Sequence, residues 1–205
     1  MDDISRVFDE FVTSGRDKTM ATGHQYSVDA ILNTIRMDKS FSFMDVGCGN
    51  GWVVRRMAAN PHCTRAVGID KSSLMIQNAK KLQRRPHEQY HIMSLDRWTS
   101  APFDLIFSME SLYYTESVSR SISKIYSMLL TGGRFVCGTD YYTENPDTKC
   151  WAGSMPITMH LHSESEWVEM FVKSGFDASY YRVRQPDSPI KWKREHGTLF
   201  IVGIK

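Results

Sequence analysis

Apolar residues recur along this 205-residue chain at two spacings, one typical of helices and one typical of strands. Helical spacing of three to four residues predicts helices at 4–11, 28–35, 53–58, 72–83, 118–129 and 163–172. Alternating or continuous apolar runs predict strands at 41–46, 66–70, 90–94, 103–109, 134–141, 178–184 and 198–204. Strands and helices alternate over most of the chain, which predicts a parallel sheet with helices on both faces.

Several helix ends carry their own sequence signals. Ser72 is a candidate N-cap for the helix that follows it, and Ser163 with Glu166 forms a capping box. Gly132-Gly133 is expected to end the helix that precedes it. The last two strands are joined by a short link, which suits an antiparallel pair. Residues 142–162 hold two prolines and mixed polarity, so we expect a long irregular insert there.

The composition of the chain is that of an ordinary globular protein. The chain is 41% hydrophobic and 23% charged, with a net charge of +2, too small to indicate a nucleic-acid or membrane partner by itself. The four cysteines are widely spaced and show no metal-ligand pattern, so no metal site is predicted. The first residues lack an apolar run and no stretch approaches a membrane span, so we expect a cytoplasmic protein without a membrane partner.

A turn rich in glycine is the first sign of a binding site. From Phe43 the chain reads F-M-D-V-G-C-G-N-G-W, where a predicted strand enters a turn with glycines at 47, 49 and 51. Such a turn, opening a helix, lets backbone N–H groups approach a ligand closely. The next strand, Ala66-Val67-Gly68-Ile69, is closed by Asp70, and an acid at that place can accept hydrogen bonds from a ribose.

The position of Asp45 narrows the ligand. A dinucleotide-binding turn normally has apolar residues on the strand before it, and a carboxylate there would oppose a pyrophosphate but attract an ammonium group. The third glycine also follows the second by two positions, not three. A ligand with an amino-acid ammonium at one end and a ribose at the other fits both features. S-adenosylmethionine is such a ligand.

Four motifs in register resemble those of the class I S-adenosylmethionine-dependent methyltransferases. M-D-V-G-C-G-N-G-W is similar to their first motif, V-G-I-D-K-S to their ribose-binding strand end, F-D-L-I-F-S-M to their fourth strand, and M-L-L-T-G-G-R-F to the turn before their fifth. The resemblance covers about residues 41–140. It implies an α/β fold, with a Rossmann-like, doubly wound, mostly parallel sheet of seven strands and an antiparallel C-terminal edge hairpin.

The same resemblance suggests how one domain of residues 1–205 is organised. Residues 1–40 would form N-terminal helices and a candidate lid, and 41–140 the cofactor-binding core. Residues 141–163 would be an insert covering the acceptor site, followed by a C-terminal helix and strand pair at 164–205. The family implies S-adenosylmethionine as cofactor and S-adenosylhomocysteine as product. The implied cofactor-binding residues are Asp45, Gly47, Cys48, Gly49, Gly51, Asp70, Lys71, Leu95, Asp96 and Met109.

Trp98 is a candidate to cover the adenine ring of the cofactor, and the alternative is that it only packs under a helix. The resemblance implies that Asp96 lies beside the adenine amino group.

Catalytic candidates follow the fourth strand and lie in the N-terminal segment. Glu110 can orient or deprotonate the acceptor, or else contact only cofactor or backbone. Tyr113 can line an aromatic wall for a cationic amine, or pack in the core. His24 can reach the cofactor or substrate if residues 14–26 form a lid; the alternative is a surface loop in which His24 caps the next helix.

The sequence is compatible with three functions. A methyltransferase acting on a nitrogen or oxygen nucleophile of a small molecule is favoured, because no nucleic-acid module is visible. The second is an RNA or protein methyltransferase, with RNA contacted through the basic 184–197 hairpin, whose alternative is a solvated hairpin tip. The third is a non-catalytic S-adenosylmethionine-binding interaction protein. The chain is expected to be a monomer or homodimer.

Overall fold

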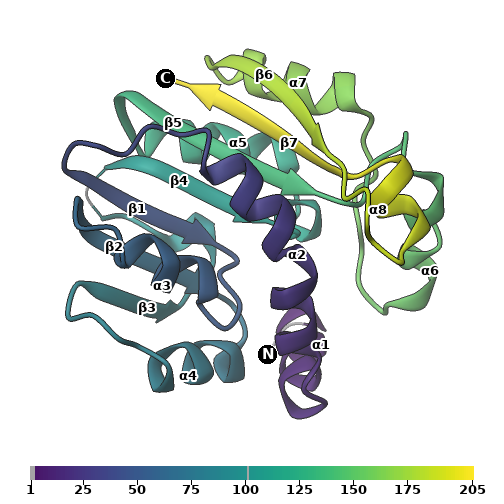
Figure 1. Cartoon of the computed structure of the whole chain (residues 1–205), viewed down its shortest axis with the longest axis horizontal. Coiled ribbons are helices and arrows are strands. Elements are labelled where there is room, and N and C mark those ends of the chain that lie inside the picture. Colours follow the sequence, from purple (N-terminus) through teal and green to yellow (C-terminus); the bar gives the residue numbers. More distant parts are fainter. Residues whose placement is uncertain (1–2, 101) are drawn as a thin grey trace.

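The computed structural model describes residues 3–100 and 102–205, and its centre is one seven-stranded sheet (Figure 1). The strand order is β3-β2-β1-β4-β5-β7-β6. Neighbours pair in parallel from β3 to β5, whereas β7 pairs antiparallel with both β5 and β6. The strands are β1 (Phe41–Val46), β2 (Cys63–Asp70), β3 (Glu88–Ile92), β4 (Phe103–Met109), β5 (Leu129–Thr139), β6 (Asp177–Val183) and β7 (Thr198–Ile204). The predicted Rossmann-like α/β fold with its antiparallel edge is confirmed.

Helices cover both faces of this sheet, because apolar side chains alternate between its two sides. Helices α2 (Arg16–Leu32), α3 (Trp52–Ala58) and α4 (Ser73–Lys81) contribute to one buried cluster with Phe43 and Phe107. Helices α5 (Val118–Ser127) and α7 (Glu164–Lys173) contribute to the other, with Met44 and Phe135. Figure 1 shows α3 and α5 on opposite sides of the strands.

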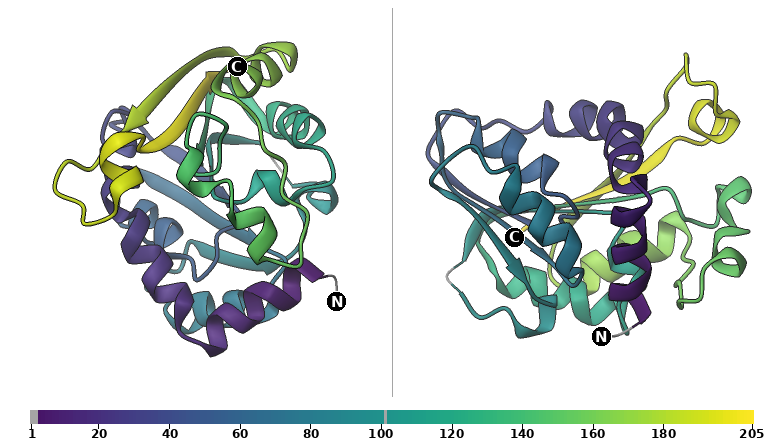
Figure 2. Two further views of the ribbon diagram at one scale, coloured as in Figure 1. Left: turned by 90° about the vertical axis from the view of Figure 1, so that its right-hand side faces the viewer. Right: turned by 90° about the horizontal axis from the view of Figure 1, so that it is seen from below.

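The remaining helices lie at the carboxyl end of the parallel strands or beyond it. Helix α1 (Asp3–Thr13) packs beside α4, and Figure 2 shows it crossing one end of the sheet. The short elements are η1 (Leu95–Arg97), η2 (Leu112–Tyr114), η3 (Pro146–Thr148), α6 (Trp151–Ser154) and α8 (Lys191–Glu195). None of the helices among these described residues is long and apolar enough to cross a membrane.

The helix caps read from the sequence are confirmed where a side chain makes them. The Ser72 hydroxyl accepts a hydrogen bond from the Met75 N–H at 3.0 Å, and Ser163 with Glu166 forms both halves of a capping box. Gly132-Gly133 does not end a helix. Helix α5 ends at Ser127, and Gly132 (φ 76°) lies inside β5, where the pairing with β4 shifts register.

Two expected loops are helical in the structure. Residues 16–32 form one continuous helix, so His24 lies in mid-helix and caps nothing. The basic stretch from Lys191 is helix α8. Its Lys193 is buried, and the ammonium donates a hydrogen bond to the backbone carbonyl of Gly23 in α2, so this lysine is neither a solvated tip nor available to a ligand.

Candidate functional site

The turn between β1 and α3 needs its glycines for geometric reasons. Gly47, Gly49 and Gly51 all have positive φ, at 76°, 51° and 76°. A Cβ on Gly47 would lie 2.0 Å from the hydroxyl oxygen of Ser111, and one on Gly51 would lie 2.5 Å from the ring of Tyr90. At Gly49 a Cβ would make only an ordinary contact, 3.8 Å from the sulfur of Met75, and Gly49 lines a cavity. The turn is therefore tightly packed on two sides and accessible on a third.

Asp70 joins this turn to the end of β2. Its carboxylate accepts a hydrogen bond from the N–H of Gly49 at 2.9 Å through one oxygen and from the N–H of Ser72 at 2.8 Å through the other. Burial raises the pKa of Asp70, although these backbone donors oppose the rise. Each oxygen keeps a lone pair for a further donor, such as a hydroxyl group.

Asp45 places a second carboxylate beside the same turn. It is 2% exposed, and no group within residues 3–100 or 102–205 donates a hydrogen bond to it. Burial, and then repulsion from Asp70, raise its pKa well above the ordinary value. A buried carboxylate is costly without a donor or a cation. A ligand with an ammonium group would supply both.

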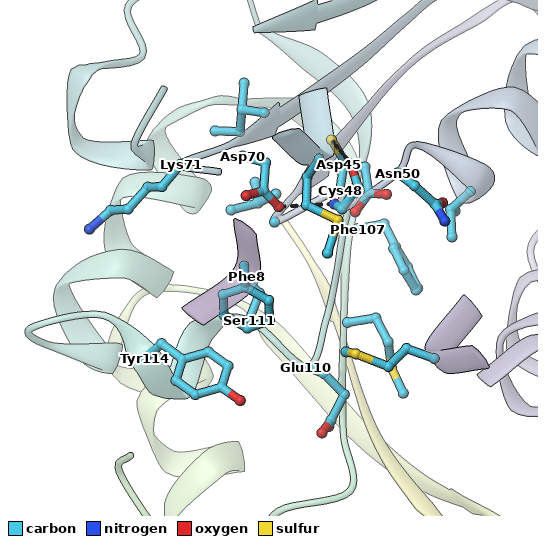
Figure 3. Close-up of a pocket in the computed structure, with 18 of the residues that line it drawn as sticks. Phe8, Asp45, Cys48, Asn50, Asp70, Lys71, Phe107, Glu110, Ser111 and Tyr114 are labelled. Carbon is cyan, nitrogen blue, oxygen red and sulfur yellow. Dashed lines mark hydrogen bonds between the residues drawn. The ribbon is translucent and has the colours of Figure 1, made fainter. Parts of the chain in front are cut away.

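These residues line one cavity at the carboxyl ends of the parallel strands, where open α/β sheets bind ligands. In Figure 3, Asp45 and Asp70 lie close together, Glu110 lies on the opposite side, and the amino end of Lys71 extends away. Of the predicted cofactor-binding residues, those on the cavity lining are Asp45, Gly47, Cys48, Gly49, Asp70, Lys71, Leu95 and Met109. Gly51 supports the turn from behind without lining the cavity.

The segment after β3 turns two of its candidate side chains away from the cavity. Asp96 is exposed and does not line the cavity, whereas Met93, Ser94 and Leu95 do. Trp98 is buried against His91 and Phe103, which is its packing alternative, and not over a ligand. The 3-10 turn η1 begins at Leu95 and carries Asp96 outward, a detail that spacing alone does not determine.

Helix α1 forms part of the cavity wall. Asp9 caps α4 by accepting hydrogen bonds from the Ser72 hydroxyl at 2.5 Å and from the N–H of Leu74 at 3.1 Å. Phe8 lies edge-on against Tyr114, with ring centroids 5.4 Å apart, and both line the cavity. Residues 14–26, where the sequence predicts a lid, also line the cavity, through Asp17, Met20, Ala21 and His24. That lid stays a prediction, and α1 adds the contacts to α4 and η2.

Glu110 occupies the opposite wall under unusual constraints. Among residues 3–100 and 102–205, it is the one non-glycine residue with positive φ, at 52°. Its carboxylate accepts hydrogen bonds from the N–H of Asp140 and from the hydroxyl of Tyr113, the latter at 2.8 Å. Burial, and then the charge of Asp140, raise the pKa of Glu110 to about 7. Such strained positions concentrate at functional sites.

His24 approaches Glu110 from α2 and pairs with Asp140. The two atoms His24 Nε2 and Asp140 Oδ2 are 3.2 Å apart. Burial lowers the pKa of His24, but its hydrogen bond to Asp140 and the charges of Asp140 and Glu110 outweigh burial, so the net pKa is raised above 6.5. His24, Glu110 and Asp140 each offer one atom that could ligate a metal ion, and these three atoms lie within 4.8 Å of one another.

Asp140 is the site residue that the sequence reasoning missed. It is fully buried, and its Oδ1 accepts no hydrogen bond from any described group. Its backbone carbonyl accepts hydrogen bonds from Asn145 and Thr148 of the insert, at 2.9 and 3.1 Å. The signal was available, because Asp140 directly follows β5 and an acid at a strand's carboxyl end is the same feature that singled out Asp70.

Tyr113 reaches the site indirectly. It is buried and does not line the cavity, but its hydroxyl contacts both Glu110 and, at 3.3 Å, the hydroxyl of Tyr114. Burial, and then the charge of Glu110, raise the pKa of Tyr113 well above its ordinary value. It is therefore a neutral donor to Glu110 and not a charged group.

The insert lies next to this network but outside the cavity lining, as far as the structure describes the chain. The rings of Tyr113 and Tyr141 have centroids 5.5 Å apart, and the N–H of His160 donates to the carbonyl of Tyr113 at 2.9 Å. The rings of His160 and His162 stack with centroids 6.3 Å apart. The role of the insert as an acceptor-site cover stays a prediction.

Parts of the chain are similar in sequence to known methyltransferases. Residues 44–137 match the family model described as Methyltransferase domain. The tRNA U34 carboxymethyltransferase of Shewanella putrefaciens is 33% identical over 116 residues, which cover 54% of this chain and 35% of the relative. That of Shewanella loihica is 34% identical over 107 residues, covering 49% and 32%. The chain spans about a third of the length of these curated relatives.

Solved structures match over nearly the whole chain. A chain of the complex between the Haloferax volcanii Trm112 methyltransferase activator and a methyltransferase superposes with a TM-score of 0.90, at 25% identity and 96% coverage of both chains. Magnesium protoporphyrin IX methyltransferase from Synechocystis, solved with bound S-adenosylhomocysteine, gives a TM-score of 0.72 at 19% identity and 100% coverage of both. The second likeness is one of fold.

Proposed function

We propose that this chain, which belongs to the class I S-adenosylmethionine-dependent methyltransferases, transfers a methyl group from S-adenosylmethionine to a nitrogen or oxygen nucleophile held beside Glu110. The observation that carries the proposal is one cavity with two different walls. Asp45 and Asp70 lie on one wall, and Glu110 with its raised pKa lies on the other. The first wall suits the cofactor, and the second suits removal of a proton.

The cofactor's polar groups fit the two carboxylates of this wall. The buried carboxylate of Asp45 would bind the ammonium, and the free lone pairs of Asp70 would accept the ribose hydroxyls. Gly49 lines the cavity and has no side chain, so it allows close approach of the ligand to the backbone. When bound, S-adenosylmethionine supplies a methyl group on a sulfonium sulfur, which takes the C–S bonding pair as the acceptor's lone pair forms the new bond.

The chain's own residues would then handle the proton. With a pKa of about 7, Glu110 can be ionised at neutral pH and still accept a proton effectively. The proton leaves the acceptor and passes to the Glu110 carboxylate, while the Tyr113 hydroxyl and the N–H of Asp140 hold that carboxylate in place. The charges of Asp140 and His24 set its pKa in opposite directions. Glu110 is thus the catalytic base in this proposal, and Tyr113 and Asp140 are positioning residues.

Among acceptors, we favour a nucleoside of transfer RNA. The curated relatives named above are described as acting on tRNA U34, and their similarity covers about half of this chain. This reverses the preference for a small molecule that the sequence suggested. The small-molecule acceptor stays the second candidate, because Phe8 and Tyr114 give the cavity an aromatic wall on the side of α1.

A protein partner is also part of the proposal. The Haloferax volcanii match comes from a complex with the Trm112 methyltransferase activator, at 25% identity over 96% of both chains. We expect this chain to bind an activator subunit of the same kind. Copurification with a coexpressed Trm112 homologue, absent for an unrelated protein of similar size, would support this expectation.

Incubation with labelled S-adenosylmethionine tests the function. The protein, with and without the activator, is given separate pools of transfer RNA, other RNA, proteins and metabolites, and the label in each pool is counted. We expect label in transfer RNA from the wild type and a loss of at least about 100-fold in the Glu110→Gln variant. Cofactor binding without label in any pool would overturn catalysis and favour the interaction-protein reading. Label in metabolites alone would overturn the RNA acceptor.

A further inference from the structure

A hollow lined by four arginines lies on the helical face of the sheet that carries α3 and α4. Arg55 and Arg56 come from α3, Arg84 and Arg85 come from the loop between α4 and β3, and Trp52 and Ala59 complete the lining. Two segments separated in sequence by about one βα unit therefore direct guanidinium groups toward one space. Guanidinium groups bind phosphate bidentately, and Arg is the preferred residue for phosphate recognition.

Protein carboxylates compensate this charge only in part. Arg56 pairs with Asp29 at 2.9 Å. Arg55 donates to the backbone carbonyl of Asn50 at 2.6 Å, which leaves its charge unpaired. No carboxylate of residues 3–100 or 102–205 lies within 4 Å of the guanidinium of Arg84 or Arg85. The hollow keeps a clear excess of positive charge.

The loop that carries Arg84 and Arg85 is held in shape by a buried acid. The Glu88 carboxylate accepts hydrogen bonds from the backbone N–H groups of both arginines, at 3.3 and 3.0 Å, and from the hydroxyl of Tyr90 at 2.9 Å. Because the acid binds their backbone, both side chains stay free while the loop stays ordered. This arrangement presents the two guanidinium groups to a ligand from a fixed loop.

Trp52 connects this hollow to the cofactor cavity. Trp52 is half-buried and lines both spaces, so the arginine hollow and the cavity are neighbours. An indole face can also stack on an unpaired base, which a free inorganic anion would not use. Lys80 and Lys81, in the last turn of α4, add positive charge to the same end of that helix.

The basic hairpin singled out by the sequence is a weaker alternative. Lys193 is buried on Gly23, Lys191 lies 3.7 Å from Glu195, and Arg194 donates to the carbonyl of Ser188. Most of its cationic side chains are therefore engaged within the protein. Arg184 is exposed, but it is a single residue, whereas Arg84 and Arg85 line one hollow together with Arg55 and Arg56.

We propose that the hollow formed by Arg55, Arg56, Arg84 and Arg85 binds backbone phosphates of an RNA substrate, with Trp52 facing a base beside them. This inference rests on the proposed RNA acceptor. RNA phosphate contacts release counterions, so each lost contact lowers both the affinity and its dependence on salt.

The test compares two double variants that remove the same charge. Arg84→Ala/Arg85→Ala removes the free guanidinium groups of the hollow, and Arg184→Ala/Lys191→Ala removes two exposed cations of the hairpin. Binding of bulk transfer RNA is measured by fluorescence anisotropy at several potassium chloride concentrations. For the first variant we expect affinity to fall at least about tenfold and the slope of log K against log salt to shrink by about 1.4 to 1.8. The second variant is expected to bind like the wild type.

Three results would overturn the proposal. The first is wild-type affinity and slope in Arg84→Ala/Arg85→Ala, and the second is an equal loss of affinity in the hairpin variant. The third concerns pyrophosphate, measured as a probe for a free anion. If Arg84→Ala/Arg85→Ala loses pyrophosphate binding but keeps transfer RNA binding, the hollow binds a free anion and not RNA. Calorimetric binding of S-adenosylmethionine by the first variant is expected to stay unchanged, which separates this result from a folding defect. Because the readout is RNA binding, failure of methyl transfer to RNA by the wild type counts against the proposed function and leaves the hollow to its own test.

Discussion

The Glu110 carboxylate accepts a hydrogen bond from the backbone N–H of Asp140, which joins the carboxyl ends of β4 and β5 directly. The same contact holds Glu110 at its positive φ and brings its charge next to that of the Asp140 side chain. One hydrogen bond thus positions the carboxylate, while burial and the neighbouring charge move its pKa toward neutrality.

Methyl transfer by the wild type is expected to rise with pH through about 7. Glu110 must be ionised to accept a proton, and burial with the charge of Asp140 raises its pKa to about 7. In kcat/KM measured from pH 5.5 to 9, Glu110→Gln should lose about 100-fold or more and should lose the rising limb. A limb that persists unchanged in the variant would assign the titration to another group.

The raised pKa of Glu110 also predicts how the stability of Glu110→Gln, relative to the wild type, changes with pH. The folded-state pKa of Glu110 is raised from 4.5 to about 7, so its contribution to stability is fully present below pH 4.5 and is lost as pH rises to about 7. Glu110→Gln removes this loss. The difference in free energy of unfolding between variant and wild type, from urea titrations at pH 5 and pH 8, should therefore favour the variant more at pH 8.

Asp70→Ala is expected to weaken S-adenosylmethionine binding by about 100-fold, since hydrogen bonds to a charged group contribute about 1.5–3 kcal/mol each. The variant also leaves the N–H groups of Gly49 and Ser72 without an acceptor, so some stability is lost as well. Asp70→Asn keeps one acceptor oxygen, so its affinity for S-adenosylmethionine, measured by calorimetry, should lie between those of the wild type and Asp70→Ala. Wild-type affinity in Asp70→Ala would remove Asp70 from the ribose site.

Strand periodicity and glycine spacing were enough to predict the sheet and one wall of the cavity. Asp45 and Asp70 could be found because each lies at the carboxyl end of a strand with a recognisable motif. The other wall depends on contacts between distant segments. His24 meets Asp140 across 116 positions because α2 runs past the end of β5, and no local pattern predicts that approach.

Two further side chains are directed by packing and not by their place in the sequence. Lys193 reads as solvated in a basic stretch, yet α8 turns it toward Gly23, 170 positions away. Asp96 reads as a ligand by its place after β3, yet the η1 turn directs it to solvent. In each case tertiary packing decides the direction of a side chain that local sequence leaves open.

The pKa of His24 is expected to depend on Asp140. Burial and Lys193 lower this pKa, while Asp140 and Glu110 raise it. Asp140→Asn removes a negative charge 3.2 Å from Nε2, so the imidazole pKa should fall below that of the wild type. Histidine NMR titration measures the shift, with Glu110→Gln as a second variant that should lower the pKa less. An unchanged His24 pKa in Asp140→Asn would show that the ion pair is not formed in solution.

Asp9→Ala is expected to loosen α1 from the cavity. Asp9 accepts hydrogen bonds from Ser72 and Leu74 at the start of α4, and losing such a cap costs about 0.5–2 kcal/mol. If α1 is the lid of the cofactor cavity, cofactor should protect amides of residues 3–13 from hydrogen exchange in the wild type, and this protection should shrink in Asp9→Ala. Asp3→Ala, at the exposed far end of the same helix, is the matched control and should behave like the wild type. Equal exchange of residues 3–13 with and without S-adenosylmethionine would show that α1 is a fixed wall and does not move with the ligand.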